Sequence, residues 1–210
     1  MDLTLYTNPM SRGRIARWMC EEVREGAGID YETVLLDYGT TMKAPEYLAV
    51  NPMGKVPAIR HGRTVVTEAA AICAYLGDAY PEAGLAPERG DPARGPYYRW
   101  LFFAAGPLEA AIVNRSFGFE VETPQDRGRT GYGSMGDVVA ALDGWLSEHE
   151  HVAGGGFTAA DVYVGAAIGW GLEFGTVPER ASFKDYAARL QSRPAAVRAR
   201  RIDDELVARG

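Results

Sequence analysis

The first eighty residues alternate between the short hydrophobic pattern of strands and the longer pattern of helices. Short runs of apolar and β-branched residues occur at Leu3–Tyr6 and Tyr31–Leu36, which predicts two strands. Residues 56–60 and 63–67 flank His61-Gly62 and predict a hairpin. These four segments predict a small mixed sheet.

Helical spacing fills the gaps between these strands. In the segment 14–23, apolar residues recur three or four positions apart, at Ile15, Trp18, Met19 and Val23. Residues 44–50 predict a short helix, and Glu68–Tyr80 predicts a longer one. The order βαβ, helix, ββα predicts an α/β domain of thioredoxin-like type over residues 1–82.

The pattern changes after residue 82. Residues 83–92 are rich in proline and glycine, as linkers are. Beyond them the pattern predicts no strand, and residues 93–210 are predicted to form an all-α domain. Its helices are expected over 93–117, 135–150, 158–174, 182–192 and 194–207. Pro107 is expected to kink the first of these.

Composition and charge narrow the function classes. The net charge of −6 argues against a nucleic-acid partner, and we interpret the cluster Arg193, Arg198, Arg200 and Arg201 as a solvated helix face. Cys20 and Cys73 form no C-x-x-C motif, so we expect buried core thiols in a reducing, cytoplasmic setting. No signal peptide or membrane-spanning run is evident.

The stretch "NPMGKVPAI" (51–59) places Pro57 at the start of a predicted core strand. Proline cannot donate a strand hydrogen bond, so one interpretation is that it only shapes a turn. The alternative is a cis Val56-Pro57 bond that leaves the N–H and C=O of Val56 unpaired at the sheet edge. An extended peptide could then pair with Val56 as an added strand.

Two charged residues lie close to this stretch. Glu68 enters a predicted helix, where its carboxylate could bind a ligand's ammonium group, or simply interact with the helix dipole. Lys55 precedes Val56 and could bind a carboxylate. Together these groups suit a short peptide with one amine and two carboxylates.

Three stretches carry a resemblance that covers nearly the whole chain. With "NPMGKVPAI", "TEAAAICAYL" and "FTAADVYVG", the sequence resembles the cytosolic glutathione transferase superfamily. The resemblance implies a thioredoxin-like domain, a helical domain and a homodimer. It implies that Val56, beside Pro57, pairs with the cysteinyl unit of glutathione and that Lys55 faces the glycine carboxylate. It implies that Glu68 and the backbone of Ala69 hold the γ-glutamyl end, although many members have serine in place of Ala69.

The residue that activates the glutathione thiol is expected in "YTNPMSRGRI". We favour Ser11, because serine-type classes such as theta place their serine five residues after the aromatic residue of the "LY" pair, here Tyr6. Tyr6 itself and Asn8 are the alternative donors. Ser11 could instead only cap the following helix.

The resemblance implies a second, hydrophobic electrophile bound against the helical domain. Candidate pocket residues are Tyr97, Trp100, Phe103 and Phe117. The glycines in 127–137 indicate a mobile loop. We interpret His149 and His151 as loop residues, so no metal site and no cofactor besides the co-substrate glutathione are expected.

The function expected from these residues is a glutathione transferase that attacks electrophiles with the glutathione thiolate, in detoxification. Alternatives are a glutathione-dependent peroxidase or disulfide reductase, and a non-catalytic binding module of the same fold. The third stretch is interpreted as structural. In "FTAAD", Thr158 and Asp161 have the spacing of a capping box, and Phe157 and Val162 that of a hydrophobic staple.

Overall fold

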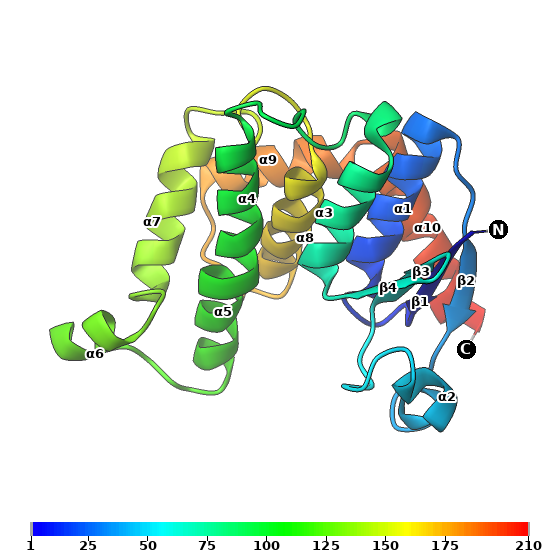
Figure 1. Ribbon diagram of the computed structural model, residues 1–210. Helices are drawn as coiled ribbons and strands as arrows, with labels where there is room; N and C mark the ends of the chain where they lie inside the picture. The colour runs from blue at the N-terminus through cyan, green and yellow to red at the C-terminus, as the bar shows by residue number, and fades with distance from the viewer. Residues whose placement is uncertain (1, 210) are drawn as a thin grey trace. The chain divides into compact units, whose positions relative to one another are not determined.

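The structure, a computed structural model, describes residues 2–209 (Figure 1). Residues 1 and 210, the outer ends of the two predicted domains, lie outside the described residues. The chain forms two compact units, residues 2–86 with 192–209 and residues 87–191. The boundary after residue 86 lies inside the predicted linker. No helix of the described residues is long and apolar enough to cross a membrane.

The first unit is a four-stranded sheet with helices, as predicted. Its strands are ordered β2-β1-β3-β4, with β1 parallel to β2 and antiparallel to β3, and with β3 and β4 joined as the predicted hairpin. The elements are β1 (Leu3–Thr7), α1 (Gly13–Ala27), β2 (Glu32–Leu35), η1 (Thr41–Lys43), α2 (Pro45–Leu48), β3 (Ala58–His61), β4 (Thr64–Thr67), α3 (Ala69–Ala79), η2 (Pro81–Ala83) and α10 (Pro194–Arg209).

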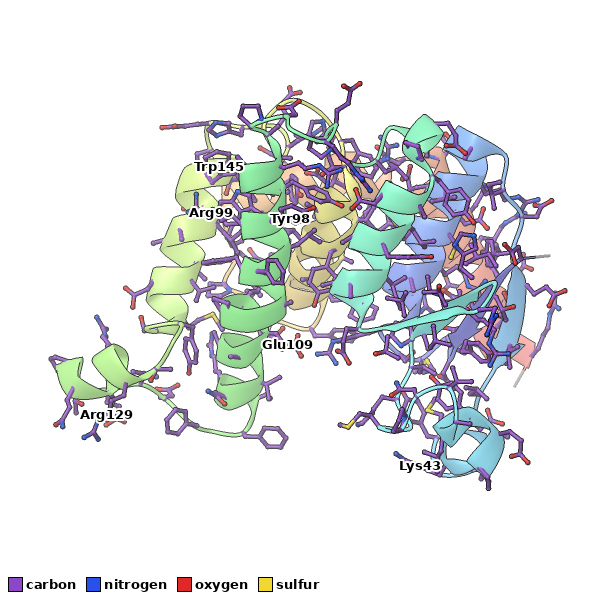
Figure 2. All side chains as sticks on the ribbon, in the orientation of Figure 1. Lys43, Tyr98, Arg99, Glu109, Arg129 and Trp145 are labelled. Carbon is purple, nitrogen blue, oxygen red and sulfur yellow. The ribbon has the colours of Figure 1, made fainter. Side chains whose placement is uncertain are left out.

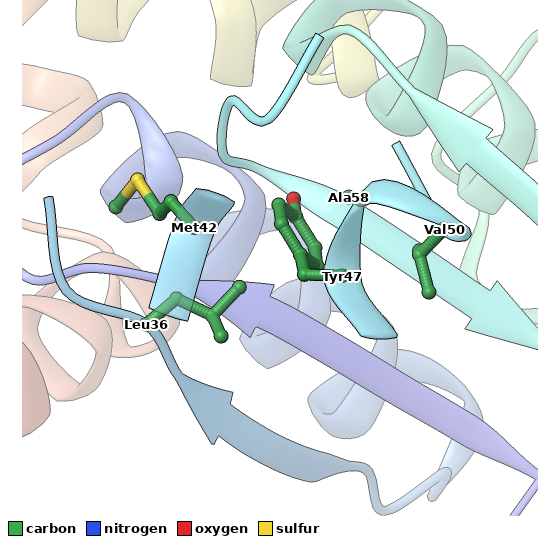
Figure 3. Packing of buried hydrophobic residues seen from close by; sticks show 5 residues of the cluster. All are labelled: Leu36, Met42, Tyr47, Val50 and Ala58. Carbon is green, nitrogen blue, oxygen red and sulfur yellow. The ribbon is translucent and has the colours of Figure 1, made fainter. Parts of the chain in front are cut away.

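Alternation along β1 separates two apolar layers. Leu3 and Leu5 are fully buried on one face of the sheet, whereas Tyr6 points to the other face, where it pairs across the sheet with Ala58. Tyr6 packs there against a buried cluster that includes Tyr47 of α2. The full cluster is Leu36, Met42, Tyr47, Val50 and Ala58 (Figure 3). The cluster fixes the segment between β2 and β3, which leads into the predicted peptide-binding stretch.

The apolar spacing in α1 produces the buried face that the sequence predicts. Ile15, Trp18, Met19 and Val23 are all buried. The helix is longer than its periodic stretch, and it ends where Gly28 adopts a left-handed conformation with φ of 70°. Glycine takes this conformation without the steric penalty that a side chain would bring.

The last helix, α10, belongs to the first unit, so the predicted helical domain 93–210 ends earlier, at residue 191. Arg17 of α1 and Asp203 of α10 form an ion pair of 2.7 Å, with side chains only 2% and 1% exposed. Arg193 and Arg198 reach the buried carboxylates of α1, at 2.7 Å from Glu22 and 3.1 Å from Glu21.

The interpretation of the arginine cluster as a solvated face is therefore wrong for Arg193 and Arg198. Each of them satisfies an acidic side chain that α1 buries, and an unpaired buried carboxylate would be costly. Arg201 does lie on the surface, with 70% of its side chain exposed.

All the regular secondary structure among the described residues of the second unit is helical. Its elements are α4 (Arg94–Phe103), the π-helical segment η3 (Ala104–Leu108), α5 (Glu109–Ser116), α6 (Pro124–Arg129), α7 (Met135–Leu146), α8 (Ala159–Glu173) and α9 (Ala181–Gln191). Pro107 lies in the π-helical segment, so the helix predicted over 93–117 is interrupted where the sequence indicates a kink. The short helix α6 was not predicted, because the glycines around it indicated a loop.

The predicted capping box at the start of α8 is present. The Asp161 carboxylate is fully buried and accepts hydrogen bonds from the backbone N–H groups of Thr158 and Val152, each at 2.9 Å. It also accepts the hydroxyl of Tyr186 at 2.9 Å. Burial, with the adjacent Asp161 charge, raises the pKa of Tyr186 well above its ordinary value. Asp161 thus ties α8, α9 and the preceding loop together.

Candidate functional site

The strand register brings the predicted peptide-binding residues to one edge of the sheet. Ala58 at the start of β3 lies opposite Tyr6 near the end of β1 and opposite Thr67 at the end of β4. The loop after β1, the segment before β3 and the residue after β4 therefore meet at the same edge. These three segments carry the predicted site residues. Asn8 and Ser11 lie in the loop after β1, Val56 and Pro57 directly precede β3, and Glu68 directly follows β4.

The Val56-Pro57 peptide bond is cis, which confirms this alternative among the sequence interpretations. Among the described residues, the backbone N–H and C=O of Val56 take part in no hydrogen bond. Pro57 is buried and Val56 is half-buried, so the two free groups of Val56 stand at the margin of the sheet. This is the arrangement that an added extended peptide requires.

Two residues that the sequence reasoning missed hold this segment in place. The carbonyl of Lys55 accepts hydrogen bonds from the Tyr47 hydroxyl at 2.6 Å and from Asn51 Nδ2 at 2.8 Å. Burial raises the pKa of Tyr47 to about 12, so its hydroxyl stays protonated and donates. The Asn51-Pro52 dipeptide, a turn signal, could have pointed to Asn51.

Lys43 also stabilises the turn that precedes Lys55. Its Nζ donates to the carbonyls of Met53 and Gly54, both at 3.0 Å (Figure 2). The Lys55 side chain, by contrast, is exposed and has no hydrogen-bond or ion-pair partner among the described residues. Lys55 is thus available to a carboxylate.

Glu68 has an unusual backbone. It is the one residue other than glycine with positive φ in the described part of the chain, at φ 67° and ψ 120°. Such conformations cost about 1–3 kcal/mol and are concentrated at functional sites. Its side chain is exposed and has no partner in residues 2–209. Helix α3 begins at the next residue, Ala69, and the first N–H groups of a helix have no partner within it.

The Ser11 hydroxyl is already engaged in two hydrogen bonds. It donates to the carbonyl of Asn8 at 2.6 Å and accepts from the backbone N–H of Gly13 at 2.9 Å. A Cβ at Gly13 would overlap the hydroxyl of Thr7, so this close approach requires glycine. Ser11 therefore holds the first N–H of α1 from the residue before the N-cap position, Arg12, and to act on a thiol its O–H must turn away from Asn8.

The other two donors have different surroundings. Asn8 engages both ends of its amide, since Nδ2 donates to the Leu36 carbonyl at 2.8 Å and Oδ1 accepts from the Met10 N–H at 2.9 Å. The Tyr6 hydroxyl has no hydrogen-bond partner among the described residues. Its ring, however, packs 5.6 Å from that of Tyr47, on the cluster side of the sheet. The choice between the three donors stays a prediction.

The candidate pocket aromatics differ widely in exposure. Tyr97 and Trp100 are fully buried, and the Trp100 ring packs against Phe103 at 5.2 Å and Trp145 at 5.7 Å within the helical unit. This burial gives Tyr97 and Trp100 a packing role. Phe117 is 86% exposed. That Trp100, Phe103 and Phe117 line an electrophile pocket stays a prediction.

The cysteines are fully buried, as expected, and are not candidates for a nucleophile. Burial raises the pKa of the Cys20 thiol to about 12, and it raises that of Cys73 as well. No group of three or more His, Cys, Asp or Glu side chains suited to a metal ion occurs in residues 2–209. His149 lies in the loop after α7, as predicted, and its half-buried ring stacks on that of Trp145 with the ring centroids 3.8 Å apart.

The chain is similar in sequence and fold to glutathione S-transferases. The family model of the glutathione S-transferase N-terminal domain matches residues 14–79. Glutathione S-transferase GST-4.5 of Xanthomonas campestris pv. campestris is 27% identical over 82% of this chain and 84% of its own length.

Solved structures extend the similarity to nearly the whole chain. The glutathione S-transferase of Xylella fastidiosa is 26% identical, with a TM-score of 0.75, over 96% of this chain and 98% of that protein. A sphingomonad glutathione S-transferase complexed with glutathione is 27% identical, with a TM-score of 0.72, over the same shares.

Proposed function

We propose that this chain is an enzyme of the cytosolic glutathione transferase superfamily, which binds glutathione and activates its thiol for attack on a hydrophobic electrophile. The sphingomonad relative has glutathione bound in its structure, which supports glutathione as the partner here. Cytoplasmic location and a homodimer are part of the same proposal.

The observation that carries this proposal is the convergence of complementary free groups at one sheet edge. Glutathione offers an ammonium group, two carboxylates and a peptide backbone. The unpaired backbone of Val56 matches the cysteinyl unit, and the unpaired carboxylate of Glu68 matches the ammonium group. The N–H of Ala69 at the start of α3 and the free Lys55 side chain match the two carboxylates.

These contacts would place the glutathione sulfur beside the loop after β1. There the bound thiol loses its proton to solvent, and the Ser11 hydroxyl donates a hydrogen bond to the thiolate. The start of α1, a helix of fifteen residues, adds the positive end of its dipole. The thiolate then donates its electron pair to the electrophilic carbon, a carbon–sulfur bond forms, and the leaving group departs with the electrons of its former bond.

Glutathione binding tests the proposal directly. We expect Glu68→Gln to weaken glutathione binding by at least about ten-fold in calorimetry, because a hydrogen bond to a charged group contributes ~1.5–3 kcal/mol. Glu32→Gln is the matched control. Glu32 is an exposed residue of β2 that pairs with Thr4, at the opposite end of the strands, so this variant should bind like the wild type.

A measurement of catalytic turnover distinguishes an enzyme from a non-catalytic binding module of the same fold. The wild type should conjugate glutathione to a dinitro-substituted aryl chloride with release of chloride. Binding of glutathione without turnover of this substrate or of an organic hydroperoxide would contradict an enzyme. Turnover of the hydroperoxide alone would assign the peroxidase alternative.

A further inference from the structure

A concave site lies within the helical unit alone. A cavity of about 270 Å³ is lined by residues from the end of α5, the segment that follows it, α6 and the first turn of α7. None of its lining residues is a candidate for the glutathione site or for the predicted electrophile pocket. It therefore needs an explanation of its own.

The charged groups of this cavity favour an anion. Arg115 of α5 and Arg127 of α6 both line it, and neither makes a hydrogen bond or ion pair with its side chain among the described residues. Glu120 is the one acidic residue that lines it. The lining is thus net positive on a chain whose net charge is −6. Two unpaired guanidinium groups form a natural receptor for a carboxylate.

Asp137, which follows the lining residue Gly136, already has hydrogen-bond partners. Asp137 accepts hydrogen bonds from the backbone N–H of Ser134 at 2.8 Å and from its hydroxyl at 2.6 Å. These bonds lower the pKa of Asp137, and the field of Arg127 contributes a smaller part. Arg127 therefore influences Asp137 from a distance and remains free to bind a ligand.

The rest of the lining suits an aromatic body. Phe119, 54% exposed, lies with Val121 and Met135 around the cavity. The Tyr132 oxygen accepts a hydrogen bond from Asn114 Nδ2 at 3.0 Å, which leaves the O–H of Tyr132 to donate to a ligand. The cavity volume falls just below the ~300–1,000 Å³ of drug-sized pockets, so one or two fused rings suit it.

We propose that this cavity binds a small aromatic carboxylate, with the carboxylate between Arg115 and Arg127 and the ring against Phe119 and Met135. Tyr132 donates to the same carboxylate. The site is independent of the proposed transferase activity, because its residues take no part in holding glutathione.

Calorimetry of the full chain with 1-naphthoate, in the presence of saturating glutathione, tests this site. We expect saturable binding of one equivalent, and no comparable binding of 1-naphthamide, which has the same rings without the charge. Arg115→Gln and Arg127→Gln should each weaken naphthoate binding by at least about ten-fold. Both side chains are exposed and make no hydrogen bond, so the fold should be unaffected.

The matched control is Arg129→Gln, because Arg129 lies in the same last turn of α6 but does not line the cavity (Figure 2). It removes the same charge and should leave binding unchanged. If Arg127→Gln and Arg129→Gln weaken naphthoate binding equally, the effect comes from the overall charge of the protein and not from this cavity, which would overturn the proposal. Equal binding of the naphthamide, or no saturable binding by the wild type, would overturn it too.

Discussion

Replacing Ser11 by alanine probes the proposed chemistry most directly. In the structure, the Ser11 hydroxyl donates to the Asn8 carbonyl at 2.6 Å, so donation to a bound thiolate means giving up that bond. A hydrogen bond to a charged group contributes ~1.5–3 kcal/mol, and a neutral one ~0.5–1.5 kcal/mol. The net stabilisation of the thiolate is then roughly 1 kcal/mol, or close to one pKa unit.

Ser11→Ala should therefore raise the pKa of the enzyme-bound thiol by about one unit. At pH values below both pKa values, the thiolate fraction and the rate of conjugation should fall about ten-fold. Well above both pKa values the rates should converge, and glutathione affinity should change little. Ultraviolet absorbance of the bound thiolate against pH, together with the pH profile of kcat, measures these quantities.

The same substitution has a structural cost that can be measured separately. The Ser11 hydroxyl accepts the N–H of Gly13 at 2.9 Å, and loss of such a hydrogen bond costs ~1 kcal/mol, so the free energy of unfolding should fall by about that amount. Tyr6→Phe is the control, since it removes only a hydroxyl. If Tyr6→Phe raises the thiol pKa and Ser11→Ala does not, the reasoning is refuted and the donor is a tyrosine. If neither variant moves the pKa, Ser11 has only this structural role.

Three further predictions concern stability and assembly. Burial raises the pKa of Asp203 despite the adjacent Arg17, which indicates that this ion pair is costly to bury. Asp203→Leu alone should therefore lower the free energy of unfolding, measured with denaturant, by ~3–5 kcal/mol, because it leaves Arg17 buried without its partner. The double variant Arg17→Met, Asp203→Leu should have nearly the stability of the wild type. A double variant as unstable as the single one would contradict this. Glu68→Gly should raise the free energy of unfolding by about 1 kcal/mol by relieving positive φ while weakening glutathione binding, and a loss of stability would argue against strain there. Sedimentation at micromolar concentration should show twice the chain mass of 22.8 kDa, and a clean monomer would refute the proposed homodimer.

Local sequence signals predicted much of the secondary structure. The helical spacing of Ile15, Trp18, Met19 and Val23 places a buried face in α1, and this face is buried in the structure. Thr158 predicted the start of α8, because a capping box satisfies helix-end N–H groups within four residues of chain. Such features depend on neighbours in sequence, so they can be recognised without the fold.

The candidate site was predictable only in part. Val56, Pro57 and Glu68 stood out because proline at a strand start and an acidic residue at a helix start are locally conspicuous. The supporting hydrogen bonds from Tyr47 and Asn51 to the Lys55 carbonyl were not evident, since they depend on how the segment between β2 and β3 folds back. The helix α6 was missed for a related reason, because the glycines near it outweighed the cap that Thr123 provides.

What the sequence by itself determined is therefore the order of the elements, the fold class and the residue types at the candidate site. The tertiary structure alone decided which partners those residues meet. It assigned the Ser11 hydroxyl to Asn8, and it placed α10 against α1 instead of in the helical unit. The sequence alone indicates that Arg193 and Arg198 are surface charges, because the carboxylates that they neutralise lie about 170 residues earlier in the chain. Periodicity reports which side of an element is buried, whereas pairing between distant charges depends on packing, which only the folded chain defines.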